Sequence, residues 1–316
     1  MPTLGSIFLE LDRYGKFARA SALADYLEIL AIRNGSALVV DLEVSLNRAG
    51  WYKARRGMFT IDPDIEPDDV ETLEGADGTE SPDDPDWPEW ATAVLLQRKA
   101  ILGDRYPFQI ERGSVTALSD WCGSDYVRLL ALTAAHAYKA DLTSDPRELF
   151  ELLIVGSLRA LGFVATGMGT ATTHGRSFPE QLQISSSAVG LGSMATPYPA
   201  KTHAKDGGVD ALGALNWGDR RPGQVSIIVQ ATLGESGTWE RKIAEPKPHH
   251  WVNYLLEKLQ PIVILAVPHH IENEQFNHLL EPHRTIVDRL RLVGKLDPPL
   301  TGEDEVLNWM LSCTIQ

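Results

Sequence analysis

Three polar side chains in the C-terminal half of the sequence are of the types that a hard divalent cation binds. Asp210 follows two glycines at the start of an apolar segment, Gln230 lies near the end of the next one, and Glu151 lies in an amphipathic stretch before them. Carboxylate and carbonyl oxygens bind Mg²⁺ or Mn²⁺, and such a cation can hold a phosphate and acidify a water molecule. The pattern predicts a divalent-cation site of the kind that phosphodiester hydrolysis needs, with the Ala231 carbonyl beside the Gln230 amide as a further ligand.

Each of these residues also has an ordinary structural explanation. An Asp after two glycines often only forms a turn, and a Gln at a buried strand end is often satisfied by the backbone. Glu148, one helical turn before Glu151, is a competing ligand. The histidine pairs at 249–250 and 269–270 invite a zinc interpretation, but adjacent histidines rarely supply converging ligands.

The elements that would position these residues follow an α/β pattern. A Gly/Ser/Thr-rich stretch over 167–208 separates the first two strands. The hydrophobic periodicity predicts, in order, a helix over 146–161, strands over 163–166, 209–215 and 225–232, helical segments over 238–244 and 251–259, a strand over 261–267, and a helical region ending at 292. This order describes an αβββαβ sandwich around a small mixed sheet.

Residues 1–140 are predicted to form a separate, mainly helical domain. A polar break over 141–146 caps the next helix and marks the boundary with a second domain over 141–316. Within the first domain, residues 62–89 hold 13 acidic residues and no Lys or Arg. The simplest interpretation is a solvated, mobile insertion. The alternative is a phosphate-mimicking strip that covers a basic groove until nucleic acid displaces it.

The composition limits the class of protein. Of 316 residues 43% are hydrophobic, enough for a core, and the net charge of −14 comes almost entirely from the acidic insertion, so a local nucleic-acid contact is not excluded. The two cysteines lie far apart, which excludes a disulfide framework and a thiolate zinc site. The sequence shows neither a signal-peptide pattern nor a bilayer-length apolar run, so we expect a cytoplasmic protein without membrane contact.

The same residues occur in strings that resemble the PD-(D/E)xK restriction-endonuclease-like superfamily, and within it the Mrr-like branch. The matching strings are Phe150-Glu151 with Leu158-Arg159 and Leu161-Gly162-Phe163, then Asp206-Gly207-Gly208-Val209-Asp210, then the strand ending in Gln230. The resemblance spans residues 146–270 and implies a restriction-endonuclease-like fold and a Mg²⁺- or Mn²⁺-dependent deoxyribonuclease, an endonuclease rather than an exonuclease. In this scheme Asp210 bridges the metal, and Glu151, Gln230 and Ala231 complete its ligands.

The sequence departs from the family pattern at Thr232, where the family has a lysine that orients the attacking water. A hydroxyl brings no positive charge. We expect Lys242, in a short helix that folds back after the strand, to replace it, so that QAT...WxxK resembles a variant with a migrated lysine. The alternative is that Lys242 is a solvated surface residue, in which case the protein is a nuclease fold without hydrolysis.

Basic residues near the predicted centre are candidates for phosphate contacts without base readout, although scattered surface cations explain them equally well. They are Lys205, Arg220, Arg221 and Arg241. The resemblance implies a role in prokaryotic restriction or antiphage defence, with DNA as the partner. Further candidate partners are a motor ATPase, another defence-system subunit and a second copy of the chain in a homo-oligomer. The second function class is a catalytically inactive subunit that binds nucleic acid or a partner ATPase.

Overall fold

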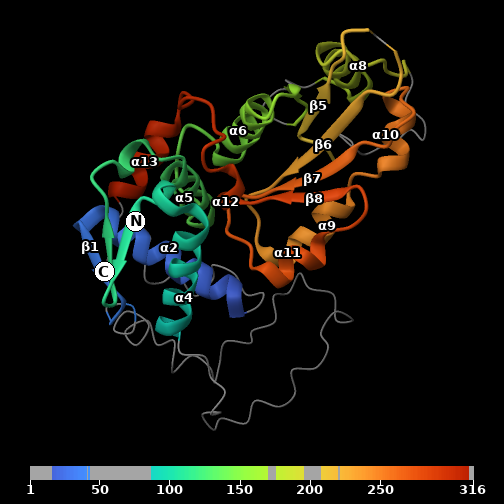
Figure 1. Ribbon diagram of the computed structural model, residues 1–316. Helices are drawn as coiled ribbons and strands as arrows, with labels where there is room; N and C mark the ends of the chain where they lie inside the picture. Colours follow the sequence, from blue (N-terminus) through green and yellow to red (C-terminus); the bar gives the residue numbers. More distant parts are fainter. Residues whose placement is uncertain are drawn as a thin grey trace, which may run out of the picture.

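The computed structural model describes residues 16–40, 42, 87–169, 176–195, 208–219 and 221–312 (Figure 1). All but the last three residues of the acidic insertion lie outside this part of the chain, as do Lys205 and Arg220. Both interpretations of the insertion therefore stay predictions. None of the helices over the described ranges has the length and apolarity that a membrane crossing requires.

The centre of the C-terminal half is a mixed sheet with the strand order β4-β5-β6-β7-β8. The strands are β4 (Val164–Gly167), β5 (Ala211–Leu215), β6 (Val225–Ala231), β7 (Ile262–Ala266) and β8 (Arg284–Val287). The first three form an antiparallel meander, whereas β7 runs parallel to β6 and β8 runs parallel to β7. A parallel neighbour requires a crossover connection, which α9 (Trp239–Ala244) and α10 (Pro248–Tyr254) provide between β6 and β7.

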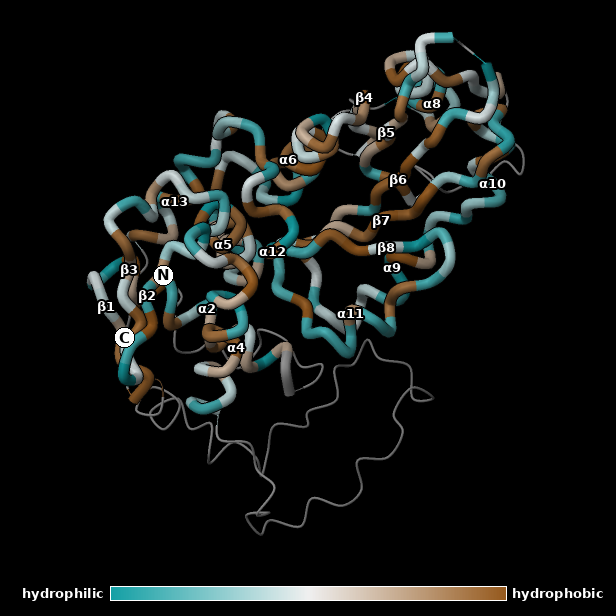
Figure 2. The backbone as a smooth tube through the Cα atoms, viewed as in Figure 1, coloured by the Kyte–Doolittle hydropathy of each residue, from teal (hydrophilic) through white to brown (hydrophobic). Residues whose placement is uncertain are grey.

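Helices cover both faces of this sheet, because successive side chains of a buried strand point to opposite faces. In β6, Ile227 and Val229 pack on the side of α6 (Pro146–Ala160), and Ile228 packs on the opposite side. The opposite side is covered by α8 (Phe178–Ala188), α9, α10 and α11 (Asn273–Leu279). Figure 2 shows the hydrophobic residues concentrated along β6 and β7, between these layers. The prediction of an α/β fold around a mixed sheet is confirmed.

The N-terminal part combines helices with a small antiparallel sheet of order β1-β3-β2. Its elements are α2 (Lys16–Asn34), β1 (Ser36–Leu38), α4 (Trp87–Leu102), β2 (Phe108–Glu111), β3 (Ser114–Ala117) and α5 (Asp125–Ala137). Two helices from the end of the chain, α12 (Arg289–Leu292) and α13 (Glu303–Ser312), pack against α5. One hydrophobic core joins all of these helices to α6 and to the sheet face beneath it. The domain boundary at residue 140 stays a prediction.

Some elements differ from the sequence-based expectation. The helical region predicted through residue 292 contains strand β8, which runs along the edge of β7 and pairs with it over residues 284–287. Helix α8 lies inside the predicted Gly/Ser/Thr-rich stretch. Its start carries a capping box between Ser177 and Glu180 and a proline in its first turn, which is a local signal for a helix start. Short 3₁₀ helices are also present over 103–105, 121–123 and 236–238.

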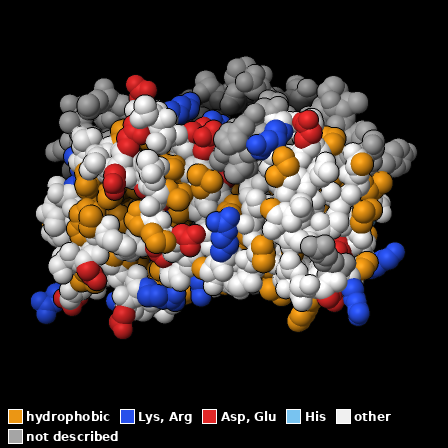
Figure 3. Space-filling model, turned by 90° about the horizontal axis from the view of Figure 1, so that it is seen from above, with side chains coloured by type: hydrophobic (Ala, Val, Ile, Leu, Met, Phe, Trp, Pro, Cys, Tyr) orange, Lys and Arg blue, Asp and Glu red, His pale blue; other side chains and the backbone are white. Residues whose placement is uncertain are grey.

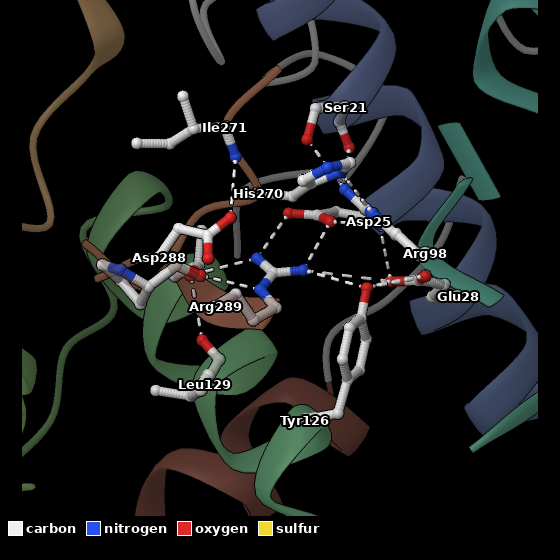
Figure 4. A network of polar contacts seen from close by, with 12 residues as sticks. Ser21, Asp25, Glu28, Arg98, Tyr126, Leu129, His270, Ile271, Asp288 and Arg289 are labelled. Carbon is white, nitrogen blue, oxygen red and sulfur yellow. Dashed lines mark hydrogen bonds and ion pairs between the residues drawn. The ribbon is translucent and has the colours of Figure 1, made fainter. Parts of the chain in front are cut away.

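A buried network of charged side chains joins α2, α4 and α12 (Figure 4). Arg289 binds Asp25 through two nitrogens, at 2.7 and 2.9 Å, and Arg98 lies 2.8 Å from Asp25 and 3.0 Å from Glu28. Tyr126 also donates to Glu28, at 2.8 Å. Burial acts to raise the pKa of Asp25, but Arg289 and Arg98 together lower it to about 2. Burial raises the pKa of Glu28.

The same network holds the segment that follows β7. Arg289 donates from Nε to the Pro268 carbonyl at 2.7 Å, and the Thr133 hydroxyl of α5 donates to that carbonyl at 3.2 Å. Arg98 Nε donates to Nδ1 of the buried His270 at 3.4 Å, so this ring nitrogen is an acceptor and carries no proton. The N-terminal helices therefore fix a loop at the end of the sheet where β6 and β7 finish.

We expect acid to destabilise the fold through His270. Burial, together with the charges of Arg98 and Arg289, holds the pKa of His270 well below 6.5. Below pH 6.5 the unfolded chain takes up a proton that the folded chain does not, so the free energy of unfolding falls as the pH drops from 7 to 5. Urea unfolding of wild type and His270→Asn at both pH values measures this contribution. The variant should lose about 1–2 kcal/mol less than wild type, and an equal loss would contradict this assignment.

Candidate functional site

The register of the sheet places Asp210 opposite Gln230. Ala211 of β5 pairs with Val229 of β6, and the Asp210 backbone N–H donates to the Val229 carbonyl at 2.7 Å. Gln230 Nε2 and the Ala231 backbone N–H then both donate to Asp210 Oδ2, at 2.8 and 2.7 Å. Two donors on one oxygen fix the orientation of this buried carboxylate.

The Glu151 side chain approaches the Asp210 carboxylate from α6. The surroundings of Gly169, which follows β4, show how near the two carboxylates lie to each other. A Cβ atom on Gly169 would lie 2.9 Å from Asp210 Oδ1 and would overlap Oε2 of Glu151. The Gly169 backbone N–H donates to the Asp210 carbonyl at 3.0 Å, which ties this segment to β5. The structure therefore brings Glu151, Asp210 and Gln230 together at one end of the sheet. Of the two candidate glutamates, Glu151 is the one whose carboxylate lies against Gly169.

The donor set at this point suits a hard cation. Two carboxylates face the small space beside Gly169, and like charges so near each other are costly unless a cation neutralises them. Gln230 Oε1 is buried and accepts no hydrogen bond from the residues that the structure describes, which is rare for a buried polar atom. In the described residues no three or more His, Cys, Asp or Glu side chains cluster as a metal site, so a cation here would depend on amide, backbone or water oxygens as well.

Thr232, at the position of the family lysine, has a local structural role. It lies two residues after Gln230 and so faces the same side of the sheet. Its hydroxyl accepts from the Gly234 backbone N–H at 3.0 Å, inside the turn that leads to α9. The buried Trp239 indole donates to the Gly234 carbonyl at 2.9 Å and fixes the start of α9 against this turn.

Lys242 of α9 forms an ion pair with Glu245, and Glu245 lies beside Gly208. The Lys242 ammonium lies 3.1 Å from Glu245 Oε2, and both side chains are about 30% exposed. A Cβ on Gly208 would lie 3.3 Å from the Glu245 Cβ, so this ion pair borders the chain two residues before Asp210. The partner of Lys242 in this structure is Glu245, and the catalytic assignment of Lys242 stays a prediction.

The remaining basic candidates are not gathered in one place. Arg241 is exposed on α9, next to Lys242. Arg221 lies after the far end of β5, because that strand runs away from Asp210, so the structure separates Arg221 from the candidate site. On the face seen in Figure 3, the Lys and Arg side chains of the described residues are scattered and form no continuous basic strip.

The predicted histidine pairs have separate contacts. His249 and His250 lie on α10 with their ring centroids 4.3 Å apart. His269 contacts the Leu233 carbonyl through Nε2 at 3.1 Å, and His270 accepts from Arg98. The two pairs therefore lie on different elements of the fold.

Comparison of the chain with protein-family models, with curated proteins and with solved structures finds no match. The family resemblance of the sequence strings therefore stays a prediction.

Gly169→Ala tests whether a cation binds in the space between the Glu151 and Asp210 carboxylates. The added methyl group would occupy the point that Glu151 and Asp210 share, so we expect Mn²⁺ to bind about 10- to 100-fold more weakly. Isothermal titration calorimetry measures this affinity. Gly192→Ala is the matched control, since its methyl would make only an ordinary contact of 3.7 Å with Leu256. Equal Mn²⁺ affinities for wild type and Gly169→Ala would contradict a cation site at this position.

Proposed function

We propose that this chain is a Mg²⁺- or Mn²⁺-dependent nuclease that hydrolyses DNA phosphodiester bonds with a restriction-endonuclease-like domain. The observation that carries the proposal is the approach of Glu151 and Asp210 at Gly169, next to a buried Gln230 amide oxygen that has no hydrogen-bond partner in the described part of the chain. A hard divalent cation would neutralise the two carboxylates and satisfy the amide oxygen at once. The resemblance of the sequence strings to the PD-(D/E)xK superfamily supports the same assignment.

The roles of the residues follow from these contacts. Asp210 Oδ2 is held by Gln230 Nε2 and Ala231 N–H, which turns Oδ1 towards Glu151 before any ligand arrives. Glu151, Asp210 and Gln230 would hold the cation, with the Ala231 carbonyl as a further ligand. A bound cation polarises the scissile phosphate and lowers the pKa of an attacking water.

Lys242 is the candidate for the positive charge that Thr232 does not supply. Its ion pair with Glu245 is partly exposed, and such pairs contribute about 1 kcal/mol or less, so Lys242 can exchange Glu245 for a phosphate at small cost. In this role Lys242 stabilises the charge that develops on the phosphate in the transition state.

A second candidate function is a catalytically inactive subunit that binds nucleic acid or a partner ATPase. The observation that favours it is the pairing of Lys242 with Glu245, together with the use of the Thr232 hydroxyl inside a turn. The setting in restriction or antiphage defence rests on the resemblance alone, and a motor ATPase or another defence-system subunit is a candidate partner in that setting.

The experiment compares cleavage of supercoiled plasmid, linear duplex and single-stranded DNA in Mg²⁺, in Mn²⁺ and in EDTA. We expect cleavage only with a divalent cation, and we expect Lys242→Ala to lower the rate by about 10²- to 10³-fold. Lys247→Ala is the control, because this exposed lysine donates to the Ala244 carbonyl at 2.7 Å and should matter little.

Two outcomes would change the assignment. If Lys242→Ala cleaves DNA at the wild-type rate, Lys242 has no role in the mechanism, although the assignment of the cation site still holds. The absence of cleavage on every substrate and with either cation would favour the inactive subunit.

A further inference from the structure

The turn between β5 and β6 presents an aromatic side chain to solvent. We call residues 216–219 and 221–224 the hairpin tip. Within it Trp217 is 71% exposed, more than any other large hydrophobic side chain in the described part of the chain. An indole buries a large area when a partner covers it, and its flat face stacks well on other rings. The hairpin tip therefore presents a ready surface for a planar ligand group.

The hairpin tip is held in place by buried polar side chains. Gln224 accepts from the Trp217 backbone N–H at 3.2 Å and donates to the Asp219 carboxylate at 3.1 Å. Glu257 Oε2 accepts from the backbone N–H groups of Gly223 and Gln224, at 2.6 and 3.2 Å. A turn that is already ordered loses little conformational entropy on binding, which favours affinity.

The acidic side chains at the hairpin tip accept hydrogen bonds within the turn, whereas the basic side chain of Arg221 is exposed to solvent. The carboxylates of Asp219 and Glu257 accept hydrogen bonds from the turn itself. Arg221 is exposed, and its guanidinium has no partner among the residues that the structure describes; Arg220 precedes it in the sequence. The hairpin tip therefore presents an exposed indole and an exposed guanidinium on the same turn.

We propose that the hairpin tip binds nucleic acid, with Trp217 stacking on an unpaired base and Arg221 binding a neighbouring phosphate. Every base has a flat face on which an indole can stack, and a guanidinium binds phosphate oxygens in a bidentate manner. The contact itself rests on the proposed function in taking nucleic acid as the ligand, and the substrate geometry also takes from it that the candidate site holds a phosphate.

The position of the hairpin tip also sets a spacing between the two proposed contacts with the substrate. It lies at the end of β5 opposite Asp210, roughly 20 Å away at the rise of an extended strand. That distance corresponds to about six nucleotides at the spacing of a duplex strand. The substrate that fits is a DNA strand with one phosphate at the candidate site. About six nucleotides from that phosphate, the same strand has unpaired bases that can reach Trp217.

The test measures binding of a labelled single strand, a blunt duplex and a tailed duplex to the full chain in EDTA, by fluorescence anisotropy. We expect Trp217→Ala to weaken binding of the single strand and the tailed duplex at least about tenfold, with Trp217→Phe close to wild type. Arg221→Ala should weaken binding and reduce its dependence on salt. Trp90→Ala is the matched control, since Trp90 is 39% exposed on α4, away from the hairpin tip.

The outcomes separate this contact from catalysis. Wild-type affinity for Trp217→Ala, or no nucleic-acid binding by wild type, overturns the proposal. Leu215 and Val164 are 37% and 44% exposed near the hairpin tip, so self-association in size-exclusion chromatography that Trp217→Ala abolishes would overturn it in favour of a protein contact. Binding that depends on Trp217, in a chain that cleaves nothing, would leave this contact standing and reject the nuclease function.

Discussion

Asp210→Asn should lower the rate of metal-dependent DNA cleavage by about 10³-fold. A bound cation supplies several kcal/mol of transition-state stabilisation, and each 1.36 kcal/mol is a tenfold change in rate. The amide of Asn keeps the size of the side chain and can still accept from Gln230 Nε2 and the Ala231 N–H. The substitution removes the negative charge next to Glu151, so the expected defect lies in cation binding and not in folding.

The control for this variant is Asp304→Asn, an exposed carboxylate in the first turn of α13. It should cleave at the wild-type rate. Circular dichroism and urea unfolding should show Asp210→Asn to be folded. Undiminished cleavage by a folded Asp210→Asn protein would show that the activity comes from another site.

Arg289→Met should lower the free energy of unfolding by about 3–5 kcal/mol. Arg289 is fully buried and binds both oxygens of Asp25, so its removal leaves a buried carboxylate with one cation fewer. It also removes the donor to the Pro268 carbonyl, which loosens the segment after β7. Urea unfolding at pH 7 measures the change.

Arg147→Met is the comparison, because the Arg147 side chain is 66% exposed and pairs with Asp145 at the start of α6. Its loss should cost about 1 kcal/mol or less. The double variant Asp25→Leu/Arg289→Met should regain much of the stability, since it leaves Arg98 paired with Glu28 at 3.0 Å. A cost below about 1 kcal/mol for Arg289→Met would show that the network does not hold the fold together.

The sequence predicts those parts of the fold that depend on local patterns. The apolar run over 225–232 indicates a strand buried on both faces, and the structure has β6 at 225–231 between two layers of helices. The polar break before residue 146 predicts the start of α6, where Asp145 accepts from the Arg147 N–H and caps the helix. These signals lie within a few residues of the elements that they describe.

Features that depend on distant segments could not be predicted. Asp25 and Arg289 are 264 positions apart, and nothing local to either residue identifies its partner. The only local signal for the network was that Asp25 and Glu28 in α2, and Arg98 in α4, lie within apolar stretches of sequence. A charged side chain on a buried helix face requires a partner of opposite charge. Strand β8 forms because β7 offers an edge for pairing, which four residues do not reveal.

The sequence singled out three residues that the fold brings together, but it did not reveal the contacts among them, and the cation site that they would form stays a prediction. The signal was the order of Glu151, Asp210 and Gln230 along the chain. The role of Gly169 depends on the distance between two carboxylates and has no sequence signal of its own. The Lys242–Glu245 pair could have been expected, since residues three apart on a helix are neighbours and opposite charges attract.

A crystal structure with Mn²⁺, analysed by anomalous scattering, tests the central claim most directly. We expect one Mn²⁺ peak beside Gly169, with oxygens of Glu151 and Asp210 and the Gln230 amide oxygen as ligands at about 2.0–2.6 Å. The peak should be absent from Asp210→Asn crystals prepared in the same way. A Mn²⁺ peak at another position, or clear density for these three side chains with no cation between them at saturating Mn²⁺, would contradict the account.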